Sequence, residues 1–173
     1  MKKLTVLFLI LALALSLASC SGDAEIPKGM QIASDEGVAY TLFVPSSWIL
    51  TESSGIYGAY YSSSDRSSVN VSSFYPESDM ASIDDYWSTC KASYAETYKN
   101  FSVISEAEQT LWGEKAALKY VFSADIDTVS YKFMQIIAVH NNMFYTFTYT
   151  STPENYDSHY EDVDKMITEF IFK

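Results

Sequence analysis

The chain has 173 residues, 48% of them hydrophobic, and its 22 acidic and 11 basic side chains give a formal net charge of −11. This length and apolar content are enough for one domain with a core of its own. A negative charge of this size repels phosphate backbones and anionic lipid head groups, which argues against nucleic acid as a partner and against electrostatic adsorption to membranes.

Residues 1–19 have the composition of a secretory signal peptide. Lys2 and Lys3 precede an uncharged, Leu-rich run at 4–17, which is shorter than the roughly 20 apolar residues of a permanent membrane helix. Leu17-Ala18-Ser19-Cys20 then resembles the lipobox of bacterial lipoproteins, in which the cysteine thiol is acylated and the peptide is cut just before it. The alternative is an ordinary signal peptide with a chance cysteine at its end.

The lipobox resemblance implies that acyl chains such as palmitate on Cys20 hold the mature protein on the extracytoplasmic face of the cell membrane. Two chains anchor stably where one is marginal, because each buried methylene contributes about 0.8 kcal/mol. Loss of Lys2 and Lys3 with the signal would change the formal charge from −11 to −13. The lipid, and not the charge, would therefore hold the protein at the bilayer, in a host with one membrane or two.

Cys90 is the only other cysteine, so the mature chain has no partner for an intramolecular disulfide once Cys20 is acylated. Its place in the middle of an apolar helical stripe predicts a small buried residue. The alternatives are a reactive thiol or a bridge to another chain.

Residues 20–29 are small and polar and include Pro27 and Gly29, a composition typical of a flexible tether. We expect a single domain over 30–173. Its first part reads as short strands, because apolar residues alternate in three runs, at 40–44, 56–61 and 69–75.

The period then changes to three or four residues, which predicts a helix over about 82–100. Ser82 can cap its first turn by accepting from the backbone N–H of Asp85. The apolar stripe of this helix contains Ile83, Trp87, Cys90, Tyr94, Tyr98 and Phe101.

Strands return from 102 to 150. The run from Tyr131 to Val139 is apolar on both faces and is typical of an interior strand. Asn141-Asn142 predicts a two-residue hairpin turn, after which Tyr145, Phe147 and Tyr149 should face the core.

A second helix is predicted over about 153–168, with a hydroxyl cap from Ser151 or Thr152 and Pro153 in its first turn. Two main helices and an antiparallel sheet of six or seven strands define an α+β fold.

Three short motifs, in this order, resemble those of PsbP-like domains over about residues 35–172. They are Phe43-Val44-Pro45-Ser46-Ser47-Trp48, then Gly113-Glu114-Lys115-Ala116-Ala117, then the strand 145–150 with a terminal helix that ends in Glu169-Phe170-Ile171-Phe172. The resemblance implies an α/β/α sandwich and a non-enzymatic binding or assembly role. It brings no catalytic residues with it.

The polar residues favour structural roles, and we expect no metal and no cofactor. His140 should lie at a hairpin end and His159 on a solvated helix face, without the convergent ligands of a metal site. The acid pairs at 125–127 and 77–79 lack the glycine-bearing loop of a calcium site and should lie in solvated loops. Ser88 and Lys91 have a spacing found in penicillin-recognising enzymes, but the other motifs of that family are missing.

Fourteen tyrosines exceed what one small core requires, and Tyr57, Tyr60 and Tyr61 cluster beside two glycines. Tyrosine combines a large contact area with a polar tip, so these three are the candidate surface for a ligand or partner. The alternative is that they line the sheet beneath a helix.

Together these features predict a lipid-anchored, non-catalytic binding or assembly module for an unknown protein or small molecule. One alternative is a hydrolase that uses a carboxylate pair such as Asp84 with Glu108, which a pocket holding both acids with raised pKa values would indicate. Another is a structural accessory of an envelope complex.

Overall fold

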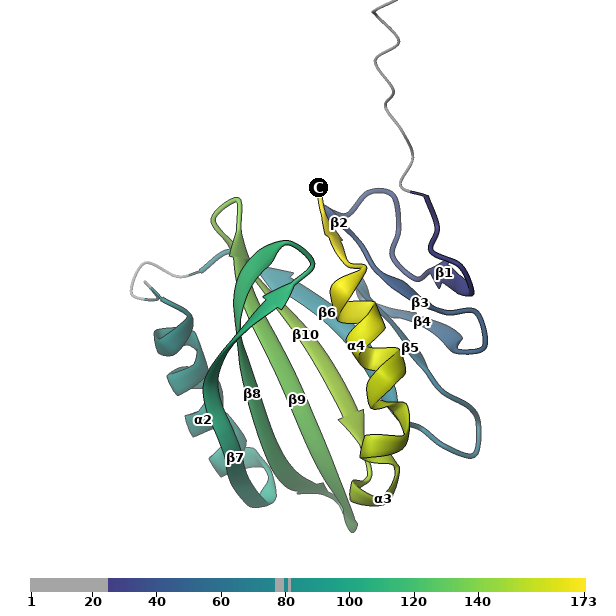
Figure 1. Ribbon diagram of the computed structural model, residues 1–173. Coiled ribbons are helices and arrows are strands. Elements are labelled where there is room, and N and C mark those ends of the chain that lie inside the picture. Colours follow the sequence, from purple (N-terminus) through teal and green to yellow (C-terminus); the bar gives the residue numbers. More distant parts are fainter. Residues whose placement is uncertain (1–24, 77–79, 81) are drawn as a thin grey trace, which may run out of the picture.

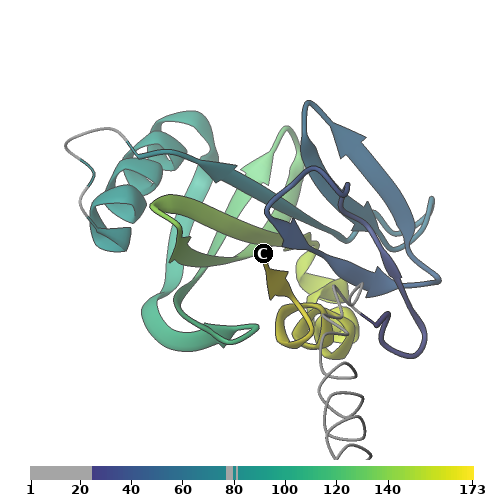
Figure 2. The same ribbon diagram turned by 90° about the horizontal axis from the view of Figure 1, so that it is seen from above.

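The computed structural model describes residues 25–76, 80 and 82–173 and contains one large antiparallel sheet between two helical layers (Figures 1 and 2). The predicted signal peptide, Cys20 and the acids at 77–79 lie outside the described residues. In the part of the chain that is described, no helix has the length and hydropathy to cross a membrane.

The sheet has seven strands in the order β4-β5-β6-β10-β9-β8-β7. Two small sheets flank it, one formed by β1 with β3 and the other by β2 with β11. The strands are β1 (Met30–Ile32), β2 (Tyr40–Thr41), β3 (Phe43–Pro45), β4 (Ile49–Ser53), β5 (Ile56–Tyr60), β6 (Ser68–Phe74), β7 (Lys99–Trp112), β8 (Lys115–Ile126), β9 (Val129–His140), β10 (Met143–Ser151) and β11 (Ile171–Phe172).

The helices are α2 (Ile83–Thr97) on one face of the sheet and, on the other, α3 (Pro153–Tyr156), the 3₁₀ turn η1 (Asp157–His159) and α4 (Tyr160–Thr168). Figure 1 shows α2 beside β7 and β8, and α4 across the opposite face near β10. The α+β class and the α/β/α sandwich predicted from the sequence are therefore confirmed.

Strand β9 lies inside the sheet and is buried on both faces, as its sequence predicts. Met134 and Ile136 contribute to the core beneath α4, while Phe133 and Ile137 contribute to the cluster beneath α2. Because successive side chains of a strand point to opposite faces, one mainly apolar strand interrupted by Gln135 serves both layers.

The hairpin between β9 and β10 also forms as predicted. Asn141 and Asn142 have φ values of 50° and 60°, the left-handed conformation that a two-residue hairpin turn requires. Tyr145, Phe147 and Tyr149 then face the core beneath α4.

Both helices differ from their predicted boundaries. At its start, α2 has the predicted cap, with Ser82 Oγ accepting from Asp85 N at 3.2 Å, but it ends at Thr97 because Tyr98 is already extended (φ −103°, ψ 141°). The predicted helix over 153–168 is divided into α3, η1 and α4, and its cap residue Thr152 makes no side-chain cap hydrogen bond. Ser151 instead directs its hydroxyl to Ser67, at 2.7 Å.

Candidate functional site

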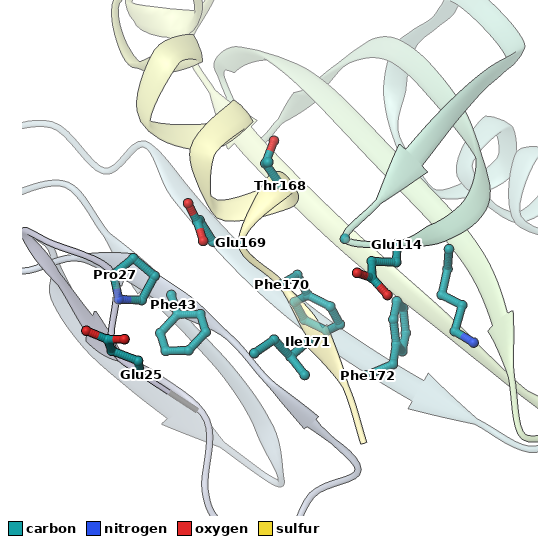
Figure 3. Close-up of a pocket in the computed structure, with 11 residues that line it drawn as sticks. Glu25, Pro27, Phe43, Glu114, Thr168, Glu169, Phe170, Ile171 and Phe172 are labelled. Carbon is teal, nitrogen blue, oxygen red and sulfur yellow. The ribbon is translucent and has the colours of Figure 1, made fainter. Parts of the chain in front are cut away.

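A hollow of about 390 Å³ opens at the end of the domain where the described chain begins (Figure 3). Four segments that are distant in the sequence meet there: the first described residues, β3, the turn between β7 and β8, and the chain that leaves α4. The lining residues are Glu25, Pro27, Phe43, Gly113, Glu114, Lys115, Thr168, Glu169, Phe170, Ile171 and Phe172.

The wall of the hollow is aromatic and tightly packed. Phe170 and Phe172 pack on the fully buried Trp112, with ring centroids 4.4 Å and 5.1 Å away. The turn is held against α4 because Gly113 N donates to Ile167 O at 2.8 Å. Gly113 has a φ of 55°, and a Cβ there would collide with the carbonyl oxygen of Phe170, so only glycine fits this position.

The rim of the hollow is acidic. Figure 3 shows the carboxylates of Glu25, Glu114 and Glu169 around the phenylalanine rings, and Lys115 is the one basic residue among the described residues of the lining. Aromatic ring faces and carboxylates both attract cations. The described residues of the lining include no histidine, cysteine or serine. Across residues 25–76, 80 and 82–173, no cluster of three His, Cys, Asp or Glu side chains is arranged to hold a metal ion.

The tyrosines of the predicted surface do not share one face. Strand alternation places Tyr57 in the core beneath α4 and Tyr60 on the other side of the sheet, where the Arg66 guanidinium lies 4.2 Å from the centre of its ring. Tyr61 lies just beyond β5, 38% exposed, with its ring 4.1 Å from that of His159. Residues three apart on a strand point to opposite faces. The spacing of Tyr57 and Tyr60 in the sequence therefore already indicated that they do not share a face.

His159 is buried, which corrects the prediction of a solvated helix face. Only 8% of it is exposed, between Tyr61 and Trp48, and its Nε2 lies 2.8 Å from Asp65 Oδ2. The other Asp65 oxygen accepts from Ser67 N at 2.9 Å and from Ser67 Oγ at 2.6 Å. Burial alone would raise the pKa of the Asp65 carboxyl, but the hydrogen bonds from Ser67 and His159 outweigh it and lower the pKa to about 2.

This cluster joins η1 to the loop between β5 and β6. Sequence reasoning missed it because Asp65 and His159 are 94 positions apart and no local pattern connects them. His140, in contrast, lies at the end of the β9–β10 hairpin as predicted, with Nε2 2.9 Å from Lys173 O.

The two acids of the alternative hydrolase lie on opposite faces of the sheet. Asp84 Oδ1 accepts from Tyr120 OH at 3.5 Å beneath α2. Glu108 forms a 2.7 Å ion pair with Lys119, whose ammonium is also influenced by Asp164 of α4. The pair therefore cannot act on one substrate atom.

Cys90 is half-buried in the aromatic cluster beneath α2. Burial raises the pKa of its thiol, against a smaller opposing effect of hydrogen bonds with Tyr86 and Tyr94. A raised pKa favours the protonated, unreactive thiol, which supports the structural role predicted for this residue.

The α/β/α sandwich with a hollow at one end is the arrangement that can be compared with known proteins. No family model matches the chain, and no curated protein matches it in sequence. Solved structures do match its fold.

Cyanobacterial PsbP from Synechocystis sp. PCC 6803 superposes with a TM-score of 0.63 at 14% identity, covering 92% of this chain and 99% of that one. LpqN, involved in cell envelope biogenesis of Mycobacterium tuberculosis, gives 0.61 at 15% identity over 83% of this chain and 91% of its own. The Ran-binding protein Mog1p of Saccharomyces cerevisiae gives 0.58 at 9% identity over 83% and 95%. The predicted PsbP-like fold is thus confirmed, and at these identities the likeness concerns the fold alone.

Proposed function

We propose that this protein is an extracytoplasmic lipoprotein, anchored through Cys20, whose domain binds a partner without catalysis. Residues 1–19 would be removed as the signal peptide and 20–29 would form the tether to a domain over 30–173. The observation that carries the proposal is the position of the hollow: Glu25, in its wall, follows Cys20 by five residues. Five residues span at most about 18 Å, so the hollow would face the zone next to the bilayer.

The last residues of the tether are docked on the domain. Gly29 O accepts from Ser46 N at 2.9 Å, and Lys28 O accepts from Lys165 Nζ of α4 at 3.1 Å. The tether therefore has little free length, which supports a fixed orientation of the hollow toward the membrane.

The lining of the hollow favours a positively charged group carried on an apolar stem. Phenylalanine rings would contact the stem, and the three carboxylates would attract the charge. Such a group occurs on small amphipathic amines and on lysine side chains of a partner protein. A role as accessory of an envelope complex is the second candidate, and the similarity in fold to LpqN, a protein of envelope biogenesis, favours it.

Anchoring is tested by comparing the native protein with a Cys20→Ala variant in a bacterial host. We expect a palmitate analogue to label the native protein and the membrane fraction to retain it, whereas Cys20→Ala should lose both the label and membrane retention. A free thiol at residue 20 of the native protein, together with release into the medium, would contradict the proposal.

The hollow is tested by placing a photoreactive amino acid at Thr168, on its exposed rim, in intact cells. A matched control places it at Thr128, which is also exposed but lies in the turn between β8 and β9. We expect a discrete crosslinked product from position 168 that disappears when Glu114 and Glu169 are both changed to Gln. Equal crosslinking from both positions would refute a site in the hollow while leaving the anchoring proposal intact.

A further inference from the structure

A second hollow, of about 230 Å³, lies on the side of β4, β5 and β6 that is opposite to α4. Strand pairing brings its residues together: Tyr60 is paired with Ser68, and Gly58 is paired with both Thr51 and Asn70. The lining is mainly polar and comprises Thr51, Tyr60, Arg66, Ser68, Val69 and Asn70.

Arg66 is the only arginine of the chain, which has 22 acidic residues. Its guanidinium lies over the ring of Tyr60, 4.2 Å from the centroid, and it forms no ion pair within the described part of the chain. The neighbouring Asp65 forms no ion pair with it, because both Asp65 oxygens are hydrogen-bonded to Ser67 and His159 on the α4 side. An oriented guanidinium without a carboxylate partner is therefore available to a ligand.

The charge of the hollow selects the ligand class. A guanidinium can hold a carboxylate through two parallel hydrogen bonds, which satisfies one negative charge with one positive charge. A phosphate dianion would need a second cation, and the described residues that line this hollow include no other basic side chain. The hydroxyls of Thr51 and Ser68 and the amide of Asn70 can then bond to hydroxyl groups on the same ligand.

We propose that this hollow binds a hydroxylated carboxylate, of which a hexuronic acid unit of a saccharide is the simplest example. The carboxylate lies on Arg66, and the sugar hydroxyls contact Ser68, Thr51 and Asn70. A polar strip continues from the hollow toward β10, where Thr150 is opposite Ser68, so a further sugar unit has a hydroxyl to meet.

This site is independent of the hollow at the tether end. Strand β10 runs from Met143, near the C-terminus, to Ser151, near the loop that carries Arg66, and nine strand residues span roughly 30 Å. Failure of either proposal therefore leaves the other standing.

The test compares three sugars that differ only in the group at C6. The protein is purified in detergent from its own host, so that it carries its natural processing. Saturation-transfer NMR should detect saturable binding of D-glucuronate, no binding of D-glucose at the same concentration, and at least tenfold weaker binding of D-glucose 6-phosphate. Equal signals from glucose and glucuronate, or from the phosphate and glucuronate, would overturn the proposal.

Two variants separate a built site from general electrostatic attraction. Arg66→Gln should weaken glucuronate binding at least tenfold. The matched control Lys132→Gln also removes one positive charge from over a tyrosine ring, 3.9 Å from the centre of Tyr156, and should leave binding unchanged. An equal loss in both variants, or no loss in Arg66→Gln, would refute the site, and the thermal unfolding midpoint of each variant verifies that it is folded.

Discussion

The nine residues of α4 bury Val163, Met166 and Ile167 against the sheet, whereas the fifteen residues of α2 bury only Trp87. Beneath α4 the sheet presents apolar side chains such as Phe147. Beneath α2 it presents polar groups as well: Gln135, Thr146 and Thr148 hydrogen-bond to one another or to tyrosines of the helix.

This difference indicates that the two helical layers contribute unequally to stability. Burial of apolar area dominates the free energy of folding, and a hydrogen bond contributes only about 1 kcal/mol net. The α4 layer should therefore supply most of the stability. The α2 layer depends on aromatic contacts and on paired polar groups.

The largest expected difference in the free energy of unfolding is between Met166→Ala in α4 and Ile83→Ala in α2. Met166 is fully buried, and its truncation should lower the free energy of unfolding by about 2–5 kcal/mol, whereas Ile83 is half-exposed and its truncation should cost about 1 kcal/mol. Urea unfolding of the purified variants measures both values. Equal losses would show that the layers are equivalent.

Gly113→Ala tests the contact between the β7–β8 turn and the chain that follows α4. The variant combines strain at positive φ with a collision against Phe170 O, and together they should cost about 3 kcal/mol. Gly55→Ala is the control, because Gly55 also has a positive φ (77°) but an added Cβ would meet no atom within 4 Å. The control should lose only about 1 kcal/mol, and the same loss in both variants would argue against the collision.

Tyr94→Phe tests the polar layer beneath α2. It removes the hydroxyl that lies 3.0 Å from Gln135 Nε2 and should cost about 1 kcal/mol, because Gln135 is buried and keeps only Thr148 as a partner. Tyr75→Phe, at a side chain that is 73% exposed, should leave the urea midpoint unchanged. If Tyr94→Phe were equally neutral, the polar contacts would not stabilise α2.

Asp65→Asn tests the link between η1 and the β5–β6 loop, and its effect should be the most dependent on pH. The folded pKa of about 2 is below the ordinary value of 3.8, so the carboxylate stabilises the protein above pH 4 and this contribution is lost as the pH falls toward 2. Urea midpoints between pH 5 and pH 2 should therefore fall less steeply in Asp65→Asn than in the native protein. Asp127→Asn, in an exposed turn, should keep the native slope, and a native slope in Asp65→Asn would disprove the link.

Much of the fold could be predicted because its signals are local. The Asn141-Asn142 turn, the cap at Ser82 and the double-sided apolar run of β9 each follow from residues a few positions apart. The helix ends were predicted less accurately, because Tyr98 continues the apolar stripe of α2 but already adopts the extended backbone that leads into β7.

The candidate sites could be predicted only in part. Tyr60 lines the second hollow, but its neighbours there are Arg66 and Ser68 and not Tyr57, and the role of the three tyrosines stays a prediction. The hollow near the tether was missed because Glu25, Phe43 and Phe170 come from three distant parts of the chain.

The sequence by itself determined most strands of the large sheet, the two helical segments, which strand faces are apolar, and the expectation of a lipid at Cys20, because periodicity and short motifs depend on near neighbours. It did not predict β4, and it placed residues 171–172 in the terminal helix, whereas they form β11. Only the tertiary structure decided that Asp65 pairs with His159 and so leaves Arg66 without a carboxylate partner. Asp65 and His159 are 94 positions apart, so their contact depends on the path of the whole intervening chain. No pattern among neighbouring residues can indicate that the contact forms.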